Sequence, residues 1–440
     1  MSIEQCDIAI IGGGPAGSTA ATLLARRGHR VVALEKARHP RFHIGESLLP
    51  MNLPVFERLG VLDKVQAMGI HKRGADFEAN NERGYNVFEF DRALGPSPPH
   101  AFQVYREQFD QMLFEHAREN GAEMRDGHEV VSIEQQSPRA TLVSVRGDDG
   151  SEYQIQARYL IDASGRDTFL SARKKLRRKN MEHQSAAIFG HFRGAIFRPG
   201  ADAGNISMYR FHAGWMWMIP LPGDVMSIGA VCRPDYLKQR KGRTVEFLLE
   251  TLKLNPALWQ RLGKAELIDE EIRVTGNYSY DSKQMGGPGW IMVGDAFAFL
   301  DPVFSSGVYL AMRSAEDAAL LVDTALSSPE LEATLHRRLE RRYRKALRRF
   351  SFFVYRFNNP VMAQLFRSPR NIWQLEQAVI SMLAGDLFDR PSVLRRLRLF
   401  KLIYAVNTLI DFRSWFAESR YRLAQARTRF TGGNTPLDKV

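Results

Sequence analysis

The stretch Cys6–Gly17, CDIAIIGGGPAG, decides the fold of this 440-residue chain. Its apolar residues predict a short buried strand, and the alanine- and leucine-rich residues behind its glycines predict a helix. Gly12, Gly14 and Gly17 have the spacing G-x-G-x-x-G. In this motif the first glycine permits a tight turn, the second lets the backbone approach a pyrophosphate, and the third lets helix and strand pack closely. The helix N-terminus offers free N–H groups to the phosphates.

A second apolar run over residues 30–34 completes a predicted βαβ unit. Glu35 stands at the end of that run, where a carboxylate can accept ribose hydroxyls and disfavours a 2′-phosphate. Strand, helix and acidic residue together predict dinucleotide binding. A glycine turn with a purely structural role is the alternative.

Periodicity further predicts a helix over 107–120, an antiparallel ribbon over 128–161, strands within 185–232 and a helix over 308–326. We expect a cofactor-binding module over residues 1–330, with a substrate sheet mainly in 185–275. A helical, basic region is expected over 331–440. With 44% hydrophobic and 25% charged residues, the composition is typical of globular proteins.

The two cysteines, Cys6 and Cys232, lie in or beside apolar runs without metal-ligand spacing, so we expect neither a disulfide framework nor a metal site. No apolar run reaches the roughly 18 residues of a transmembrane helix. The first predicted strand begins too near Met1 to leave room for a signal peptide. A cytoplasmic protein is the expectation.

The net charge of +12 is unevenly distributed. Residues 337–350, RRLERRYRKALRRF, hold eight basic residues and one acid. Such a run usually forms a solvated helix face. The alternative is a docking surface for an acidic partner, such as an acyl carrier protein or an anionic membrane. Nucleic acid is disfavoured, because no motif for binding it is present.

Two downstream segments extend the interpretation: DASGR at 162–166 and GDAF at 294–297. With the glycine motif they resemble the FAD-dependent monooxygenase superfamily, over roughly residues 5–325. The resemblance implies an α/β fold of the glutathione-reductase type, with an antiparallel substrate sheet and C-terminal helices. It implies FAD as cofactor, with Asp295 on the ribitol and Arg106 near the pyrophosphate and ribitol. A surface salt bridge is the alternative for both residues.

Within that superfamily the chain resembles the flavin-dependent halogenases of phenols and pyrroles. The matching segments are HIGESLLP at 43–50, the lysine of GIHKRGADF at 69–77, WMWMIP at 215–220 and DPVFSSG at 301–307. The family oxidises halide with reduced flavin and oxygen, and passes hypohalous acid to a distant electron-rich substrate.

The resemblance implies that Lys72 is the catalytic residue. Its ammonium group could hydrogen-bond hypohalous acid, or its neutral amine could attack the halogen. Burial would lower the pKa of this lysine and favour the second route. The alternative is a surface lysine within the basic stretch His71–Arg73.

Trp215 and Trp217 alternate, so on a strand they face the same side. With Phe304 they are expected to form an apolar wall that separates substrate from flavin; core packing is the alternative. Backbone N–H groups of Ser305, Ser306 and Gly307 could bind chloride or bromide, or simply begin a helix. Hydroxylases commonly have Pro-x-x-Gly-Gln-Gly here, and its absence argues against hydroxylation.

The resemblance also implies contacts to the flavin across the module. The implied residues are Gly12, Gly14, Pro15, Ala16, Gly17, Ser18, Glu35, Lys36, Ile44, Gly45, Ser47, Arg106, Val130, Asp295, Pro302, Gly307 and Val308.

One position departs from the tryptophan halogenases, which have a glutamate where this chain has Phe304. Together with a shorter C-terminus, this favours a phenolic or pyrrolic substrate, free or bound to an acyl carrier protein, over free tryptophan. No second dinucleotide motif follows a strand, so a separate flavin reductase is expected to supply FADH2. The alternatives are an aromatic hydroxylase or prenyl reductase on the same fold, and a flavoprotein that binds or senses without turnover.

Overall fold

The computed structural model of the chain describes residues 3–181, 183–276, 279–369, 371–388 and 390–410, together with Phe416 and Arg420. The predicted helical region after residue 330 is therefore described mainly as far as residue 410. The rest of that prediction lies outside the described residues.

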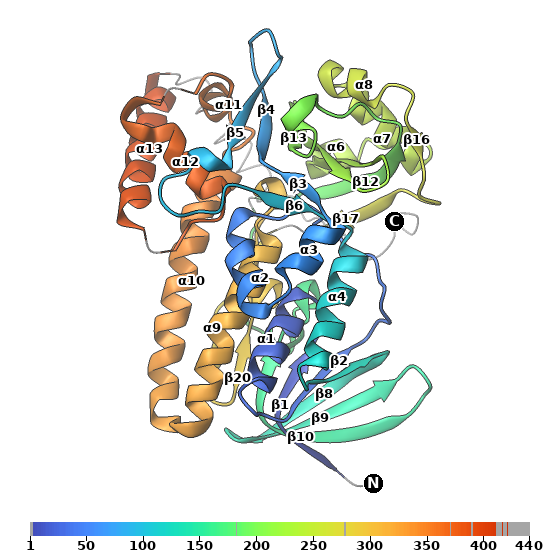
Figure 1. Cartoon of the computed structure of the whole chain (residues 1–440), viewed down its shortest axis with the longest axis vertical. Helices are drawn as coiled ribbons and strands as arrows, with labels where there is room; N and C mark the ends of the chain where they lie inside the picture. The colour runs from blue at the N-terminus through green and yellow to red at the C-terminus, as the bar shows by residue number, and fades with distance from the viewer. Residues whose placement is uncertain are drawn as a thin grey trace.

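The predicted βαβ unit is confirmed: β1 (Glu4–Ile11), α1 (Pro15–Ala25) and β2 (Val31–Glu35) follow one another (Figure 1). β1 pairs in parallel with β2 on one side and with β10 (Glu152–Asp162) on the other. β7 (Glu123–Asp126) and β20 (Trp290–Met292) extend this nucleotide sheet at its two sides. Because parallel strands end at one edge, the glycine turn and Glu35 meet there.

The predicted ribbon is also present, as β8 (His128–Ser137), β9 (Ala140–Gly147) and β10. β10 has a second role, since its parallel pairing with β1 makes it a central strand of the nucleotide sheet. The predicted helix at 107–120 is α4 (Arg106–Glu119). α1 packs against both α4 and α9 (Gly307–Ser327).

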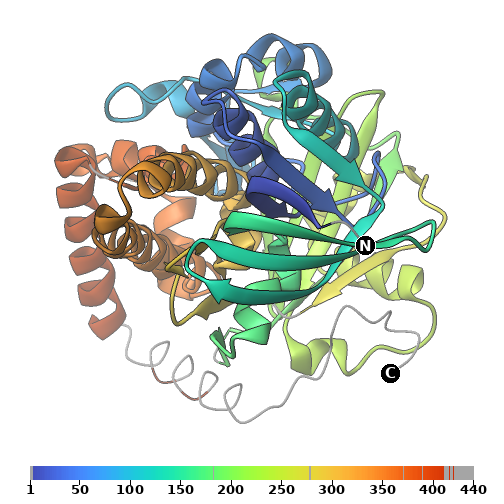
Figure 2. The same ribbon diagram turned by 90° about the horizontal axis from the view of Figure 1, so that it is seen from below.

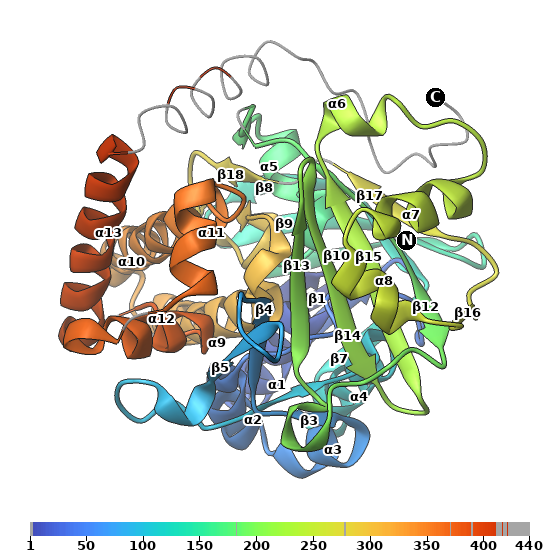
Figure 3. The same cartoon turned by 90° about the horizontal axis from the view of Figure 1, so that it is seen from above.

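The substrate sheet has the strand order β16-β12-β15-β14-β13-β4-β5, with β17 also paired to β12. Six strands come from the predicted region, and β4 and β5 come from residues before it. The strands are β4 (Gly74–Glu78), β5 (Tyr85–Glu89), β12 (Ala186–Arg193), β13 (Ile206–Phe211), β14 (Gly214–Leu221), β15 (Val225–Cys232), β16 (Glu266–Leu267) and β17 (Arg273–Gly276). Figure 3 shows this sheet between the C-terminal helices on one side and α6 (Pro234–Leu237), α7 (Thr244–Lys253) and α8 (Pro256–Leu262) on the other.

The C-terminal helices are α10 (Glu332–Val354), α11 (Pro360–Arg367), α12 (Leu375–Leu383) and α13 (Pro391–Ile410). They lie together with α9 beside the nucleotide sheet (Figure 2). A single hydrophobic cluster includes buried side chains of β1 and of α10–α13. The described C-terminal helices therefore share a core with the module, and the proposed boundary at residue 330 stays a prediction.

Shorter elements complete the fold: α2 (Leu53–Leu59), α3 (Leu62–Met68), α5 (Phe169–Arg173), β3 (Ile70–Lys72), β6 (Ala101–Gln103), β11 (Arg177–Lys179), β18 (Tyr280–Ser282), β19 (Gly286–Gly287) and β21 (Ala298–Phe299). β3 and β6 pair with each other as a small antiparallel ribbon. Among the helices described, we find none with the length and apolar character needed to cross a bilayer.

Candidate active site

A cavity of about 1300 Å³ opens where β1 and β2 end, between the nucleotide sheet and the substrate sheet. The glycine turn and residues 41–47 line one part of it, and residues 268–275 line another. Strand ends at a glycine turn are the usual ligand position of open α/β sheets. The cavity therefore lies where the sequence predicts a dinucleotide.

The three motif glycines have different physical roles. Gly12 has φ +101°, and a Cβ there would lie 2.4 Å from the carbonyl oxygen of Ala163. A Cβ on Gly17 would lie 1.9 Å from the carbonyl oxygen of Gly12. Gly14 is extended, and its Cβ would meet Arg41 Nη2 at 3.4 Å, an ordinary contact. The fold thus requires glycine at 12 and 17, whereas Gly14 leaves room on the cavity side for a ligand to approach.

Glu35 is buried at the cavity wall, as the sequence predicts. Its Oε2 accepts the N–H of Gly13 at 2.8 Å, and its Oε1 accepts the N–H of Ala37 at 3.1 Å. A carboxylate has about four acceptor sites, so ribose hydroxyls can still bind. Arg41 lies 3.3 Å from Glu35, and its buried Nε has no hydrogen-bond partner. Sequence reasoning missed Arg41, although it stands just before the HIGESLLP segment and lines the cavity.

Arg106 and Asp295 both line the cavity. The Nη1 of Arg106 donates to the carbonyl of Ile44 at 2.7 Å, and its Nε donates to Asp110 at 2.8 Å. Arg106 therefore holds the 43–50 segment as well as lining the cavity. Burial raises the pKa of Asp295 to about 6, against the opposing charges of Arg166 and Arg106. Hydroxyl donors from a bound polyol would favour its ionised form.

Most residues expected to contact the cofactor line this one cavity. They are Gly12, Gly14, Pro15, Ala16, Glu35, Lys36, Ile44, Gly45, Ser47, Arg106, Val130, Asp295, Pro302, Gly307 and Val308. Gly17 and Ser18 are not among its lining residues. Gly17 packs against the turn, and the Ser18 hydroxyl donates to the carbonyl of Gly13 at 3.1 Å.

Lys72 ends β3 and is 1% exposed, which contradicts the alternative of a surface lysine. Its Nζ donates to Ser47 Oγ at 2.8 Å and to the carbonyl of Leu48 at 2.9 Å. Burial lowers the pKa of Lys72 to about 7, while the charge of Asp76 acts in the opposite direction. Because Ser47 lines the cavity, the amine is one hydrogen bond away from it.

The two tryptophans of β14 face the same side, as their spacing predicts, and line the cavity. Trp215 Nε1 donates to Asp301 Oδ1 at 3.1 Å, whereas Trp217 Nε1 donates to Ser227 Oγ at 3.2 Å. Trp215 thus connects the wall to the 301–307 turn. Their role in excluding substrate from the cofactor stays a prediction.

Asp301 caps the 301–307 turn by accepting the N–H of Val303 at 3.2 Å. Burial raises its pKa to about 6, against hydrogen bonds that favour the charged form. Ser305 has φ +57°, and its N–H donates to the carbonyl of Pro302 at 2.9 Å. The Ser305 N–H is therefore engaged within the turn. The N–H groups of Ser306 and Gly307 lie at the start of α9, where backbone donors have no partner within the helix.

Phe304 packs among phenylalanines of α10, of α11 and of the turn between them, and is not among the lining residues of the cavity. Its ring centroid lies 5.7 Å from that of Phe350, 5.6 Å from Phe357 and 6.3 Å from Phe366. These contacts bring α10 and α11 against the 301–307 turn. A part for Phe304 in the substrate wall stays a prediction.

Sequence reasoning also missed a row of three charged side chains at the cavity wall, Glu46, His191 and Asp269. His191 Nε2 lies 2.6 Å from Glu46 Oε1, and its Nδ1 lies 3.1 Å from Asp269 Oδ1. Burial alone would lower the pKa of His191, but the two carboxylates raise it to about 9. The imidazolium therefore ties the HIGESLLP segment to residues 268–275. Glu46 lies in a recognised motif, whereas nothing in the sequence around His191 indicates this contact.

Residues 5–346 match a family model described as an FAD binding domain. With the glycine turn, Glu35 and the cavity, this match defines an FAD-binding protein. A tryptophan 2-halogenase of Chondromyces crocatus is 34% identical, over 87% of this chain and 74% of its own length. A 1H-pyrrole-2-carbonyl-[peptidyl-carrier protein] chlorinase of Pseudomonas fluorescens is 29% identical, over 93% of this chain and 95% of its own length.

Among solved structures, the myxobacterial chondrochloren halogenase superposes with a TM-score of 0.76 and 32% identity, over 90% of this chain and 96% of that one. The chain belongs to the flavin-dependent halogenases. It is accordingly an FAD-dependent oxidoreductase, and the fold expected from the sequence is confirmed.

Proposed function

We propose that the chain halogenates a phenolic or pyrrolic ring, with Lys72 as the residue that transfers the halogen. The observation behind this proposal is the buried Lys72 amine, held by Ser47 at the edge of the FAD cavity. FAD, once reduced and exposed to oxygen, supplies the oxidation of chloride or bromide to hypohalous acid. Gly14, Glu35 and Asp295 would hold the cofactor in the cavity.

The neutral amine suits the transfer step best. Its two hydrogens would be used on Ser47 Oγ and the Leu48 carbonyl, which leaves the nitrogen lone pair for the halogen. The amine attacks hypohalous acid, an N–halogen bond forms, and water leaves with one amine proton. The ring then takes the halogen as the N–halogen bond breaks, and the proton displaced from the ring restores the amine.

We predict that the halogen-transfer rate rises with pH through about 7 and then levels off. The reason is that burial lowers the pKa of Lys72 to about 7, and the deprotonated amine is the reactive form. Below that value the rate should fall about tenfold per pH unit. Single-turnover product formation, measured beside flavin reoxidation, checks this. A transfer rate that falls as pH rises through 7 would instead support the ammonium route.

Halide is proposed to bind the N–H groups of Ser306 and Gly307. We predict that Trp215→Phe raises the KM for halide about tenfold, because loss of one hydrogen bond to the charged Asp301 costs about 1.5 kcal/mol and loosens the turn. Trp217→Phe is the matched control, since its indole bonds Ser227 on the neighbouring strand. Halide dependence of product formation is the measurement. Equal KM values for halide in both variants would show that the hydrogen bond from Trp215 to Asp301 does not support halide binding.

The substrate ring is proposed from chemistry and from the relatives' names. A phenol or pyrrole is electron-rich enough to react without the glutamate that Phe304 replaces. One relative is named for a carrier-bound pyrrole, and another for position 2 of tryptophan, which lies in the pyrrole ring of indole. The deciding test is mass spectrometry of products from phenols, pyrroles and tryptophan, free and carrier-bound, with each halide in turn. A mass shift of one halogen identifies both the substrate and the halide. A hydroxylated product would instead support the alternative function, an aromatic hydroxylase.

A separate flavin reductase is proposed as the source of FADH2. Product formation should therefore require a reductase together with NADH and oxygen, and chemically reduced FAD should replace the reductase. Turnover with NADH alone would contradict this part of the proposal.

α10 offers a surface for a carrier protein. Its exposed basic stripe consists of Arg337, Arg341, Lys345 and Arg348. Arg338 is exposed beside the stripe, whereas Arg342, Arg344 and Arg349 are engaged, as in the ion pair of Arg342 with Asp317 at 3.0 Å. An acidic carrier would bind such a stripe through complementary charge.

We predict that the double substitution Arg341→Glu and Lys345→Glu lowers the kcat/KM for carrier-bound substrate about 30-fold, because each reversal replaces attraction by repulsion. Turnover of the free substrate should stay the same. Lys238→Glu with Lys241→Glu makes an equal charge change on exposed residues of another surface and serves as the control. An equal loss in both double variants would exclude a specific docking role for the stripe.

A further inference from the structure

A second cavity, of about 590 Å³, lies on the face of the substrate sheet that points away from the FAD cavity. The two faces are distinguished by β13, where Ile206 lines the FAD cavity and the neighbouring Ser207 points to the opposite side. Tyr85, Arg198 and Arg261 are among the residues that line the second cavity. None of them takes part in the halogenation chemistry described above.

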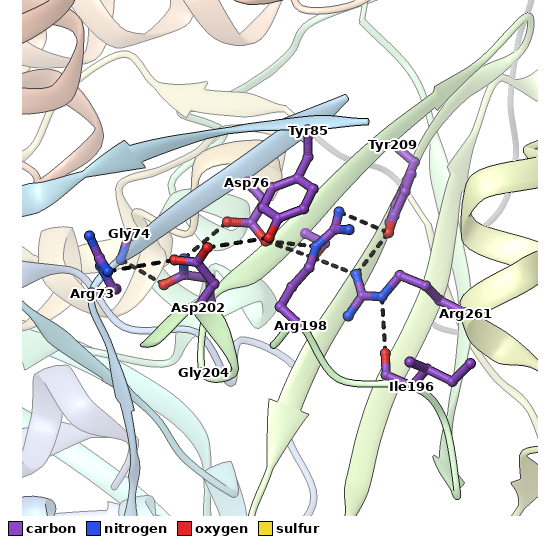
Figure 4. Close-up of polar contacts among 12 residues, drawn as sticks. Arg73, Gly74, Asp76, Tyr85, Ile196, Arg198, Asp202, Gly204, Tyr209 and Arg261 are labelled. Carbon is purple, nitrogen blue, oxygen red and sulfur yellow. Dashed lines mark hydrogen bonds and ion pairs between the residues drawn. The ribbon is translucent and has the colours of Figure 1, made fainter. Parts of the chain in front are cut away.

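Arg261 is the unusual residue of this cavity. It is 8% exposed, and its Nη1 donates to Ser207 Oγ at 2.7 Å and to the Tyr209 hydroxyl at 2.8 Å. Its Nε donates to the carbonyl of Ile196 at 3.0 Å (Figure 4). All three acceptors are neutral, and no carboxylate among the described residues forms an ion pair with Arg261. Its buried Nη2 has no hydrogen-bond partner.

A buried guanidinium with neutral partners is energetically unfavourable unless a counter-charge reaches it. The charges of Arg261 and Asp76 act on each other, but the Asp76 carboxylate is hydrogen-bonded by other donors. It accepts Arg198 Nε at 3.1 Å, the Asn205 amide at 3.0 Å and Ser207 Oγ at 3.2 Å. Because these donors use its carboxylate, Asp76 forms no ion pair with Arg261.

A second guanidinium faces the same space. The Nη2 of Arg198 lies 3.4 Å from the Tyr209 hydroxyl that also accepts Arg261, as Figure 4 shows. Its plane is held over the ring of Tyr85, 3.6 Å from the centroid. Arg83 lies exposed among the lining residues. The carboxylate on the wall, Asp202, accepts the Tyr85 hydroxyl at 3.3 Å.

We propose that this cavity, lined by Arg83, Arg198 and Arg261, binds an oxyanion, such as a phosphate or carboxylate group of a small molecule. Guanidinium groups present planar forks of donors that match oxyanions, and Tyr85 and Tyr209 hold the forks of Arg198 and Arg261 in place. The oxyanion supplies a directly bonded counter-charge for Arg261 and an acceptor for its Nη2. The site is separate from the FAD phosphates, because the substrate sheet lies between them.

The test is isothermal titration of the FAD-saturated full chain with inorganic phosphate or with succinate, at constant ionic strength. FAD saturation keeps phosphate from occupying the pyrophosphate position. We expect saturable 1:1 binding of at least one probe, weakened at least tenfold by Arg261→Gln. The probe that binds distinguishes a phosphate ligand from a carboxylate ligand.

Arg83→Ser is the second variant, because an exposed side chain can be removed without disturbing the core, and it should weaken binding severalfold. Arg395→Ser, an exposed arginine of α13, is the matched control and should leave the affinity unchanged. If Arg261→Gln does not fold, Arg83→Ser decides the question. The proposal would be overturned if neither probe showed saturable binding. It would also be overturned if Arg83→Ser and Arg395→Ser bound the probe with equal affinity.

Discussion

Replacing Lys72 with alanine should abolish the halogenated product while flavin reoxidation continues. The amine is 1% exposed and is held by Ser47 and Leu48, so its removal takes away the group that we propose receives the halogen beside the cavity. We expect the rate of product formation to fall by at least about 1000-fold, the upper range for loss of one positioned catalytic group. Hypohalous acid would escape, and a halogen trap in solution would be modified instead.

The controls separate chemistry from packing. Lys72→Met fills most of the same volume without a nitrogen and should show the same loss as alanine, with an unchanged circular dichroism spectrum. Lys64→Ala removes an exposed lysine of α3 that pairs with Glu119, and should halogenate normally. Product mass spectra and flavin absorbance are read in the same reaction. Wild-type halogenation by Lys72→Met would exclude the amine as the transfer group.

The nucleotide half of the fold could be predicted because its signals are local. The spacing of Gly12, Gly14 and Gly17 and the position of Glu35 lie within one βαβ unit. The substrate sheet was predicted less completely, since β4 pairs with β13 across a long sequence separation, as the contact of Asp76 with Ser207 shows. A short strand far upstream has no periodic signal that indicates its partner.

The same limit applies to the site. The sequence resemblance indicated Lys72 as the candidate catalytic residue. The burial of Lys72 could not be predicted, because it follows from the β3–β6 pairing and from the fold of the 43–50 segment over this side chain. Arg41 and His191 were missed, because their roles arise from contacts with Glu35 and Glu46 made in three dimensions. Ser305 is a residue that the sequence included but whose backbone is not available. Its N–H was expected to bind halide, and it donates instead to the carbonyl of Pro302.

Gly14→Val should leave the fold intact and lower the affinity for FAD by at least about 100-fold, which corresponds to about 2.7 kcal/mol. Gly14 has φ −76° and ψ −169°, which any residue adopts, and its Cβ would meet Arg41 Nη2 at an ordinary 3.4 Å. The added methyl groups would instead occupy the space where pyrophosphate approaches the backbone. FAD fluorescence titration and the melting temperature of the FAD-free chain are the two measurements.

The other glycines show why this variant is informative. Gly12→Ala should damage the fold itself, since φ is +101° and the Cβ would lie 2.4 Å from the Ala163 carbonyl oxygen. Gly28→Ala, at φ +83° with nothing within 4 Å of its Cβ, should cost about 1 kcal/mol of stability and leave FAD affinity unchanged. If Gly14→Val loses FAD while its melting temperature stays the same, the substitution acts on cofactor binding and not on the stability of the fold. Full FAD affinity in that variant would mean that the pyrophosphate does not approach the turn at Gly14.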